Sequence, residues 1–200
     1  MAGSVWRPDL LRLRTADDLR RLNPSAVGAG AVTGDVLLHW LKLVEGYWRH
    51  DGDPQRPHAE LTSGLCSNGY VNVPRLLVYA NACQAIGRAL VDLLSLKERS
   101  GVDWVVGSDH AAATLSFSVA GWLNCRHDFT ERDPNLGQRW VRHDIASAER
   151  VVHVEEIVTT GNTVRQVRQA LARWTDGPVR ILPCVLTAVR RGPPSIVCEG

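Results

Sequence analysis

The fold of this chain is decided by the stretch Arg150-Val-Val-His-Val-Glu-Glu-Ile-Val-Thr-Thr-Gly-Asn-Thr163. Most of its apolar residues are β-branched, as expected of a buried strand that is covered on both faces. Glu155 and Glu156 stand at the end of this strand, and a small polar loop follows them. Residues 164–174 continue at helical spacing, so the stretch predicts a strand, a loop and a helix.

The loop Thr159-Thr-Gly-Asn-Thr163 has the composition of a phosphate-binding site. The first amides of a helix lack internal partners and the helix dipole is positive there, so an anion is stabilised. Gly161 allows the backbone to approach closely, and three threonine hydroxyls add donors. The alternative is that Thr160 or Asn162 only caps the helix and that the acidic pair is solvated.

The acidic pair Glu155 and Glu156 indicates a further group on the same ligand. Two carboxylates next to a phosphate loop cannot both favour a bare phosphate. They suit sugar hydroxyls, or a divalent cation such as Mg²⁺. The sequence therefore predicts a site for a sugar phosphate.

This arrangement resembles the phosphoribosyl-diphosphate signature of the type I phosphoribosyltransferases. The segment 154–163 has the signature's apolar strand, acidic pair, two spacers and Thr-Thr-Gly-x-Thr, with Glu-Glu where the family more often has Asp. The resemblance implies that the 5′-phosphate of the donor is held by Thr159, Thr160, Gly161, Asn162 and Thr163. It also implies that Glu155 and Glu156 hold the ribose hydroxyls, directly or through Mg²⁺.

The segment 58–72 narrows the resemblance to the orotate phosphoribosyltransferase branch. Its composition predicts two short strands joined by a turn. That branch has Leu-Lys-Ser-Gly followed by Ser-x-x-Tyr and an Asn, a pattern kept here at Leu61, Ser63, Gly64, Ser67, Tyr70 and Asn72. Thr62 departs from it, because the branch has a lysine there that contacts the diphosphate or the base.

Residues 102–107 read as a core strand that turns into a small-residue helix through Ser108, Asp109 and His110. In the resembled family this turn grips the diphosphate through backbone amides. Asp109 would repel a diphosphate unless a cation lies between them. The alternative is that Ser108 or Asp109 is simply the N-cap of the helix.

The segment 123–137 is polar and carries charges of both signs, so we expect it to be mobile. It resembles the loop that closes over the site in the orotate branch, beginning Arg-Lys-Glu-x-Lys-x-His. Aligned from the first arginine, its positions are taken by Arg126, His127, Asp128, Thr130 and Arg132. The resemblance makes Arg126, His127, Asp128 and Asp109 the candidate catalytic residues. Thr130 cannot supply the mobile positive charge of the lysine that it replaces.

The last predicted strand, 179–189, ends in two arginines. In the orotate branch an arginine at the end of this strand recognises the carboxylate of the base. Arg191 aligns best with that arginine and Arg190 next. The alternative is that both are solvated near the end of the sequence.

Size and composition suit a globular α/β enzyme. Two hundred residues with 44% hydrophobic content are enough for one domain with a substantial core. A net charge of +2 argues against a nucleic-acid binder, and no apolar run is long enough to span a membrane. Five cysteines without Cys-x-x-Cys spacing predict free thiols and a cytoplasmic location.

The order of predicted elements indicates a mainly parallel sheet flanked by helices, with a small hood, over residues 58–200. Residues 1–57 read as a helical N-terminal extension, which includes an amphipathic helix at 36–48. A further helix is predicted at 73–96. The aromatic residues of the helix at 36–48 belong to the core or to a dimer contact. From that helix, and because the family shares loops between subunits, we expect a homodimer.

These observations predict a phosphoribosyltransferase-like glycosyltransferase. It would bind a ribose 5-phosphate donor (phosphoribosyl diphosphate or a nucleotide) and make or break the bond at C1 of the ribose, with Mg²⁺ and a base or other small acceptor. Thr62, Thr130 and Asp109 argue against ordinary orotate transfer, because together they remove two cations and add one anion. The alternative is a non-catalytic nucleotide sensor that kept the fold.

Overall fold

The structure, a computed structural model, describes residues 9–61, 64–175 and 179–192, except for the side chain of Trp174. The predictions made at Thr62, Ser63 and Cys198 lie outside this part of the chain. Two compact units divide the chain, residues 1–82 and residues 83–200. The predicted boundary between residues 57 and 58 stays a proposal beside this division.

The first unit begins with short helices that pack around buried leucine and tryptophan side chains. Thr15 caps one of them through a capping box with Asp18, and the fully buried Trp40 donates to the carbonyl of Leu10 at 3.2 Å. These helices are η1 (Leu10–Arg12), α1 (Ala16–Arg21), η2 (Pro24–Ala26) and α2 (Gly34–Leu43).

Short strands complete the first unit, and they correct the prediction of a helix at 36–48. The helix ends at Leu43, Glu45 has a φ of 53°, and Tyr47–Arg49 forms β1, which pairs antiparallel with β4 (Gly69–Val71). A Cβ at Gly46 would lie 2.8 Å from the carbonyl oxygen of Asn72, so only glycine allows this close approach. The predicted strand pair in 58–72 is confirmed by β2 (Ala59–Glu60) and β3 (Cys66–Ser67), and α3 (Pro74–Leu77) follows.

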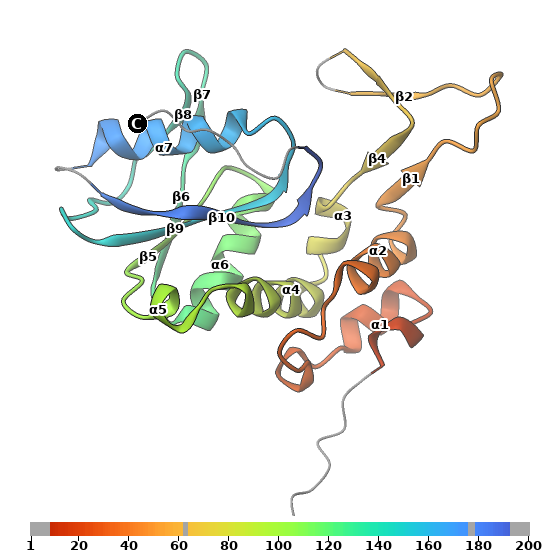
Figure 1. The fold of residues 1–200 in the computed structure, drawn as a ribbon, viewed down its shortest axis with the longest axis horizontal. Helices are drawn as coiled ribbons and strands as arrows, with labels where there is room; N and C mark the ends of the chain where they lie inside the picture. The colour runs from red at the N-terminus through yellow and green to blue at the C-terminus, as the bar shows by residue number, and fades with distance from the viewer. Residues whose placement is uncertain (1–8, 62–63, 176–178, 193–200) are drawn as a thin grey trace, which may run out of the picture. The chain divides into compact units, whose positions relative to one another are not determined.

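The second unit contains the predicted parallel sheet. Its four strands lie in the order β10-β9-β5-β6, and each neighbouring pair is parallel. The helix α7 covers one face, and α4 and α6 lie on the other (Figure 1). The strands are β5 (Trp104–Gly107), β6 (Arg126–Phe129), β9 (Arg150–Val158) and β10 (Arg180–Arg190), and the helices are α4 (Ala80–Leu93), α5 (Leu96–Arg99), α6 (Ala111–Leu123) and α7 (Asn162–Trp174).

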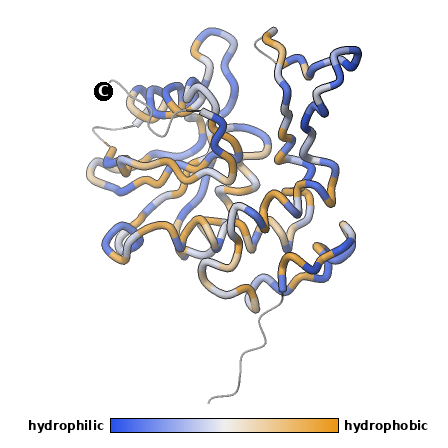
Figure 2. The backbone as a smooth tube through the Cα atoms, turned by 45° about the vertical axis from the view of Figure 1, so that its right-hand side comes forward, coloured by the Kyte–Doolittle hydropathy of each residue, from blue (hydrophilic) through white to orange (hydrophobic). Residues whose placement is uncertain are grey.

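A buried apolar cluster fixes α7 on its face of the sheet. It joins strand residues to helix residues and comprises Trp104, Val106, Trp140, Ile145, Val151, Val167 and Leu171. Hydrophobic and hydrophilic stretches of the backbone can be followed in Figure 2. On the other face, Gly87 of α4 passes so close to α6 that a Cβ there would lie 2.2 Å from the Ser118 hydroxyl. Both faces of the central strands are therefore covered, as the β-branched run predicted.

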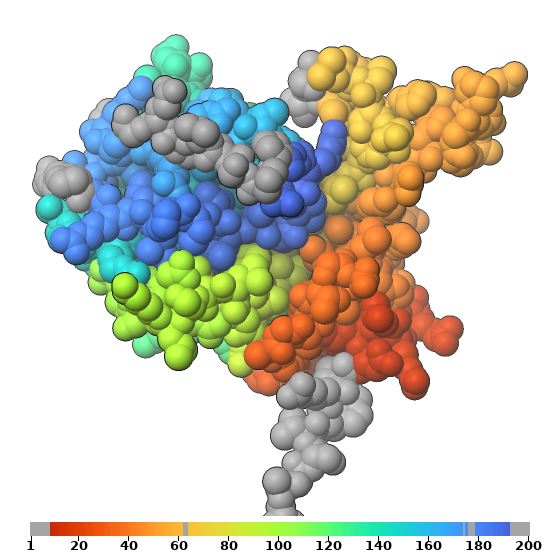
Figure 3. Space-filling view, in the orientation of Figure 1, coloured from red at the N-terminus to blue at the C-terminus, as the bar shows by residue number. Residues whose placement is uncertain are grey.

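The edge strand β10 lies at the surface of the second unit, where it forms a continuous blue band in Figure 3. Both β9 and β10 agree closely with the predicted strands, and α7 begins two residues before its predicted start. The predicted helix at 73–96 is interrupted, because the structure has α3, α4 and the start of α5 in its place. Among the helices described by the structure, none is both long enough and apolar enough to cross a membrane.

The prediction of a mobile loop at 123–137 is wrong for its first half. Arg126–Phe129 is a strand of the central sheet, paired with Trp104–Gly107. The chain then forms an antiparallel hairpin of β7 (Glu131–Asp133) and β8 (Gly137–Arg139). The strand predicted at 138–145 is thus limited to its first two residues.

Candidate functional site

The predicted phosphate loop lies between the carboxyl end of β9 and the first turn of α7. Gly161, at the N-cap position of α7, has a φ of 79°, a conformation that favours glycine, and it has no side chain to cap the helix. The amide of Asn162 donates to the hydroxyl of Thr160 at 3.4 Å. A cavity of about 50 Å³ opens here, lined by Glu155 and residues 157–164. The arrangement leaves amides and hydroxyls available to a small anion.

Glu155 is buried beside this cavity, and neither of its carboxylate oxygens is free. The Ser108 hydroxyl donates to Oε2 at 2.8 Å, and Nε2 of His153 lies 2.7 Å from Oε1. The side chain of Glu155 is 3% exposed. The alternative that both acidic residues are solvated is therefore wrong for Glu155.

Glu156 is only half-buried and has a different environment from Glu155. Burial, together with the negative charges of Glu155 and Asp109, raises its pKa from 4.5 to about 7. Because side chains alternate along a strand, Glu156 and Glu155 point to opposite faces of the sheet. Of the pair, Glu155 lines the cavity at the phosphate loop and Glu156 does not.

Asp109 lies in the turn between β5 and α6, and three side chains converge on it. Gln138 donates to Oδ1 at 2.9 Å, while Nε of Arg132 and Nε2 of His110 lie 3.4 and 3.2 Å from Oδ2. His110 itself has φ 62° and is the residue at the N-cap position of α6, without a side-chain cap bond. The alternative in which Ser108 or Asp109 caps this helix is therefore wrong.

Thr130 does not lie on a mobile loop, contrary to the sequence alignment. It is fully buried, its amide donates to the carbonyl of Gly107 at 3.0 Å, and its hydroxyl donates to Oε1 of Gln138 at 2.6 Å. Thr130, which replaces the mobile lysine of the orotate branch, is thus a buried residue that anchors the β7–β8 hairpin. Arg132, on that hairpin, is the cation that reaches the turn.

The other candidate catalytic residues lie elsewhere in the sheet. Arg126 stands opposite Trp104 at the amino ends of β6 and β5, with its guanidinium 4.5 Å from the Trp104 ring, and it pairs with Glu149. The phosphate loop follows the carboxyl end of β9. The structure therefore does not bring Arg126 to the predicted site.

His127 and Asp128 are also occupied by other contacts. Nε2 of His127 lies 2.7 Å from the hydroxyl of Ser116, and burial lowers the pKa of this histidine. Asp128 is 6% exposed and lies 3.6 Å from Nη1 of Arg142 and 3.7 Å from Nε2 of His143. Through these contacts both residues hold β6, an edge strand of the sheet, in place.

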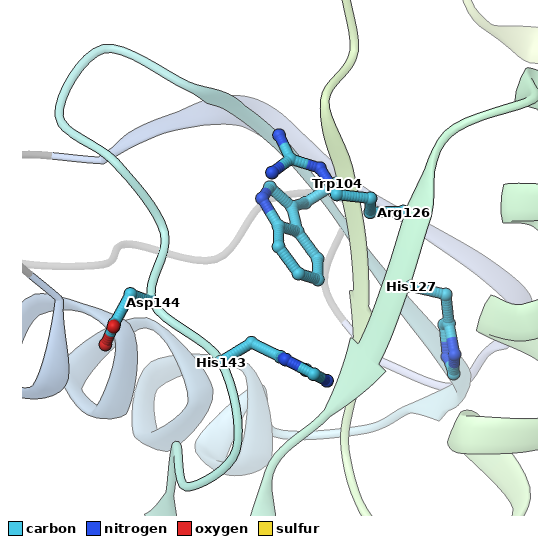
Figure 4. Close-up of a pocket in the computed structure, with 5 residues that line it drawn as sticks. All are labelled: Trp104, Arg126, His127, His143 and Asp144. Atoms are coloured by element: carbon cyan, nitrogen blue, oxygen red, sulfur yellow. The ribbon is translucent and has the colours of Figure 1, made fainter.

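A larger hollow of about 520 Å³ lies beside Arg126, lined by Trp104, Arg126, His127, His143 and Asp144. Figure 4 shows that His127 points to the other side of its strand from His143. Arg126 stacks on Trp104 and pairs with Glu149, so the guanidinium that lines this hollow already has partners. Nothing in its lining indicates a ligand.

Arg191 lies next to the phosphate loop. Its amide donates to the carbonyl of Val158 at 2.8 Å, and a Cβ at Gly192 would lie 2.2 Å from the carbonyl oxygen of Thr159. The chain after β10 thus passes directly against the start of the loop. Recognition of a base by Arg191 stays a prediction.

Sequence reasoning missed two residues of this site, His153 and Gln138. The signal for His153 was a single imidazole inside an apolar run, two residues before Glu155. Gln138 carried no local signal, since its partners Thr130 and Asp109 are distant in sequence.

The residues do not form a metal cage. No group of three or more His, Cys, Asp or Glu side chains suited to a metal ion occurs in the described part of the chain. Glu155, predicted as a ligand with Glu156, has both oxygens engaged. The protein side chains alone therefore do not fit a Mg²⁺ site.

Comparison with known proteins agrees with this fold. No family model matches the sequence. The chain is 33% identical over 117 residues to "Orotate phosphoribosyltransferase" of Caldicellulosiruptor saccharolyticus, a match that covers 58% of this chain and 60% of that protein. It is 31% identical over 143 residues to "Orotate phosphoribosyltransferase 2" of Mesorhizobium japonicum, covering 72% of this chain and 73% of the relative.

The chain belongs to the orotate phosphoribosyltransferase family. The fold of this family member is similar to the crystal structure of Mycobacterium tuberculosis orotate phosphoribosyltransferase in complex with inorganic phosphate, with a TM-score of 0.52 and 20% identity. That similarity covers 78% of this chain and 84% of the other. The predicted family and α/β fold are confirmed.

Proposed function

We propose that this chain is a phosphoribosyltransferase, which exchanges the diphosphate at C1 of a phosphoribosyl donor for a nitrogenous base. The observation that carries the proposal is the phosphate loop: the start of α7, opened by Gly161, with a small cavity lined by Glu155 and residues 157–164. A 5′-phosphate in that cavity places the ribose near the carboxyl ends of β9 and β5.

The ribose hydroxyls are assigned to Glu156. It is half-buried at the end of β9 and, unlike Glu155, has no side-chain hydrogen bond within the described structure that uses both oxygens. A carboxylate can accept hydrogen bonds from both hydroxyls of a ribose, whereas a 2′-deoxyribose offers it only one. Glu155, the preceding residue of β9, supports this arrangement through its contacts with Ser108 and His153.

The diphosphate is assigned to the turn 108–110, with Arg132 as its nearest cation. The side chain of Arg132 is 74% exposed, so it can turn from Asp109 to a ligand. Transfer breaks the C1–O bond to the diphosphate and forms a C1–N bond to the base, so charge develops on the leaving group. Mg²⁺ stays part of the proposal as an ion that enters bound to oxygens of the donor, since side chains alone do not provide its site.

Orotate is the first base to test. Two of the three departures that argued against it have less weight in the structure: Thr130 is a buried anchor, and the charge of Asp109 is offset by Arg132. Family membership favours an active transferase over altered chemistry or a sensor. The homodimer and the cytoplasmic location remain predictions.

The proposal is tested with the double variant Gly161→Ala, Thr163→Val. Ribose 5-phosphate binding, measured by calorimetry, should be lost, because φ 79° is unfavourable for alanine and the backbone of the loop must change. The circular dichroism spectrum should stay native. Orotate consumption, followed by absorbance with phosphoribosyl diphosphate and Mg²⁺, tests turnover. Unchanged phosphate affinity in the double variant would contradict the assignment of the loop.

A further inference from the structure

His153 is a buried polar residue in the middle of an apolar strand. Its side chain is fully buried, and its neighbours along β9 are Val152 and Val154. Nε2 lies 2.7 Å from Oε1 of Glu155, whereas Nδ1 has no hydrogen-bond partner within the described structure. A buried imidazole with one nitrogen unpaired destabilises a fold, so packing does not explain a histidine at this position.

Glu155 joins the two ends of the predicted donor site. It lines the cavity at the phosphate loop, and its Oε2 accepts from Ser108 in the turn that follows β5. A free carboxylate beside this cavity would repel a phosphate. Two donors, from His153 and Ser108, occupy one oxygen each and hold the carboxylate in a single orientation.

We propose that His153 is a positioning residue for the donor site. With Ser108 it holds the Glu155 carboxylate, so that the phosphate loop after β9 and the turn after β5 keep a fixed separation. Each end of the donor then meets a preformed site, and less freedom is lost on binding. The inference rests on the proposed function, and it adds a residue that touches no part of the donor itself.

Two substitutions of similar polarity separate positioning from packing. In His153→Gln the side-chain amide nitrogen extends about as far as Nε2 and can donate to Glu155. The shorter amide of His153→Asn extends only as far as Nδ1, so the hydrogen bond to Glu155 is lost. Calorimetric titration with ribose 5-phosphate should show affinity within about twofold of wild type for His153→Gln. For His153→Asn the affinity should fall on the order of tenfold, because Glu155 is left buried with one donor fewer.

Val151→Ala is the matched control for a weakened strand. Val151 is fully buried on the same face of β9 but lies in the apolar cluster, away from the loop. This variant should lower the melting temperature and leave the affinity for ribose 5-phosphate unchanged. If Val151→Ala and His153→Asn are equally destabilised and lose affinity to the same extent, the inference is overturned.

A double-mutant cycle gives a second readout. In a Glu155→Gln background, His153→Asn should have little further effect on affinity, since the carboxylate it holds is gone. Additive losses in that cycle, or equal affinity of His153→Asn and wild type, overturn the positioning role while the proposed function stands. If the wild-type protein itself does not bind ribose 5-phosphate, the proposed function fails and this inference with it.

Discussion

Replacing Glu156 by glutamine should change how stability depends on pH. Burial and two neighbouring carboxylates raise the pKa of Glu156 from 4.5 to about 7. Between these two values the folded protein keeps a proton that the unfolded chain has released. The contribution of Glu156 to stability is thus fully present below pH 4.5 and is lost as the pH rises through about 7.

The size of the effect follows from the pKa shift. At ~1.4 kcal/mol for each pH unit, a fully shielded group would destabilise the protein by about 3 kcal/mol above pH 7. Glu156 is only half-buried, so we expect roughly 1–2 kcal/mol. Glu156→Gln does not titrate, and its free energy of unfolding should therefore exceed that of wild type by this amount at pH 8.

Urea denaturation of both proteins at pH 5, 6, 7 and 8, without ligand, measures this difference. Glu149→Gln is the control without pH dependence in this range, because the hydrogen bond from Arg126 lowers the pKa of Glu149 below 4.5. That variant should be less stable than wild type by the same amount from pH 5 to pH 8, since the contribution of Glu149 is lost only at lower pH. A stability difference between Glu156→Gln and wild type that is constant from pH 5 to 8 would refute the reasoning.

Three further predictions concern the turn and the assembly. Asp109→Asn should strengthen phosphoribosyl diphosphate binding several-fold at low salt, because Arg132 is released from its ion pair; equal dissociation constants for variant and wild type would count against this. Arg132→Gln should raise KM for phosphoribosyl diphosphate by about tenfold and leave the affinity for ribose 5-phosphate unchanged. This effect is smaller than that of removing a buried oxyanion donor, because the Arg132 side chain is exposed. Light scattering should give twice the chain mass of 22.0 kDa, and a monomer mass at micromolar concentration would remove the homodimer.

The strand, loop and helix around Gly161 could be predicted from the sequence because each has a strong local signal. The β-branched run, the glycine and the helical spacing all lie within 25 residues. The edge strand Arg126–Phe129 could not be predicted in this way. Three of its four residues are polar, and they are stabilised by Glu149, Ser116 and Arg142, which lie elsewhere in the chain.

The candidate site was predicted in part for the same reason. Its phosphate loop is continuous in sequence, whereas the environments of Glu155 and Asp109 depend on side chains that the sheet brings together from separate elements. Glu155 and Glu156 were both expected to face the ligand. Only the contacts with Ser108 and His153 show that the two carboxylates have different environments.

The backbone at His110 has a consequence for protein engineering. A non-glycine residue at φ 62°, ψ −120° costs about 1–3 kcal/mol, which glycine would avoid. Selection for thermal stability alone would therefore favour glycine at this position. Such a variant would lose the imidazole beside Asp109. A substitution that increases stability would therefore alter the turn that is proposed to bind the diphosphate.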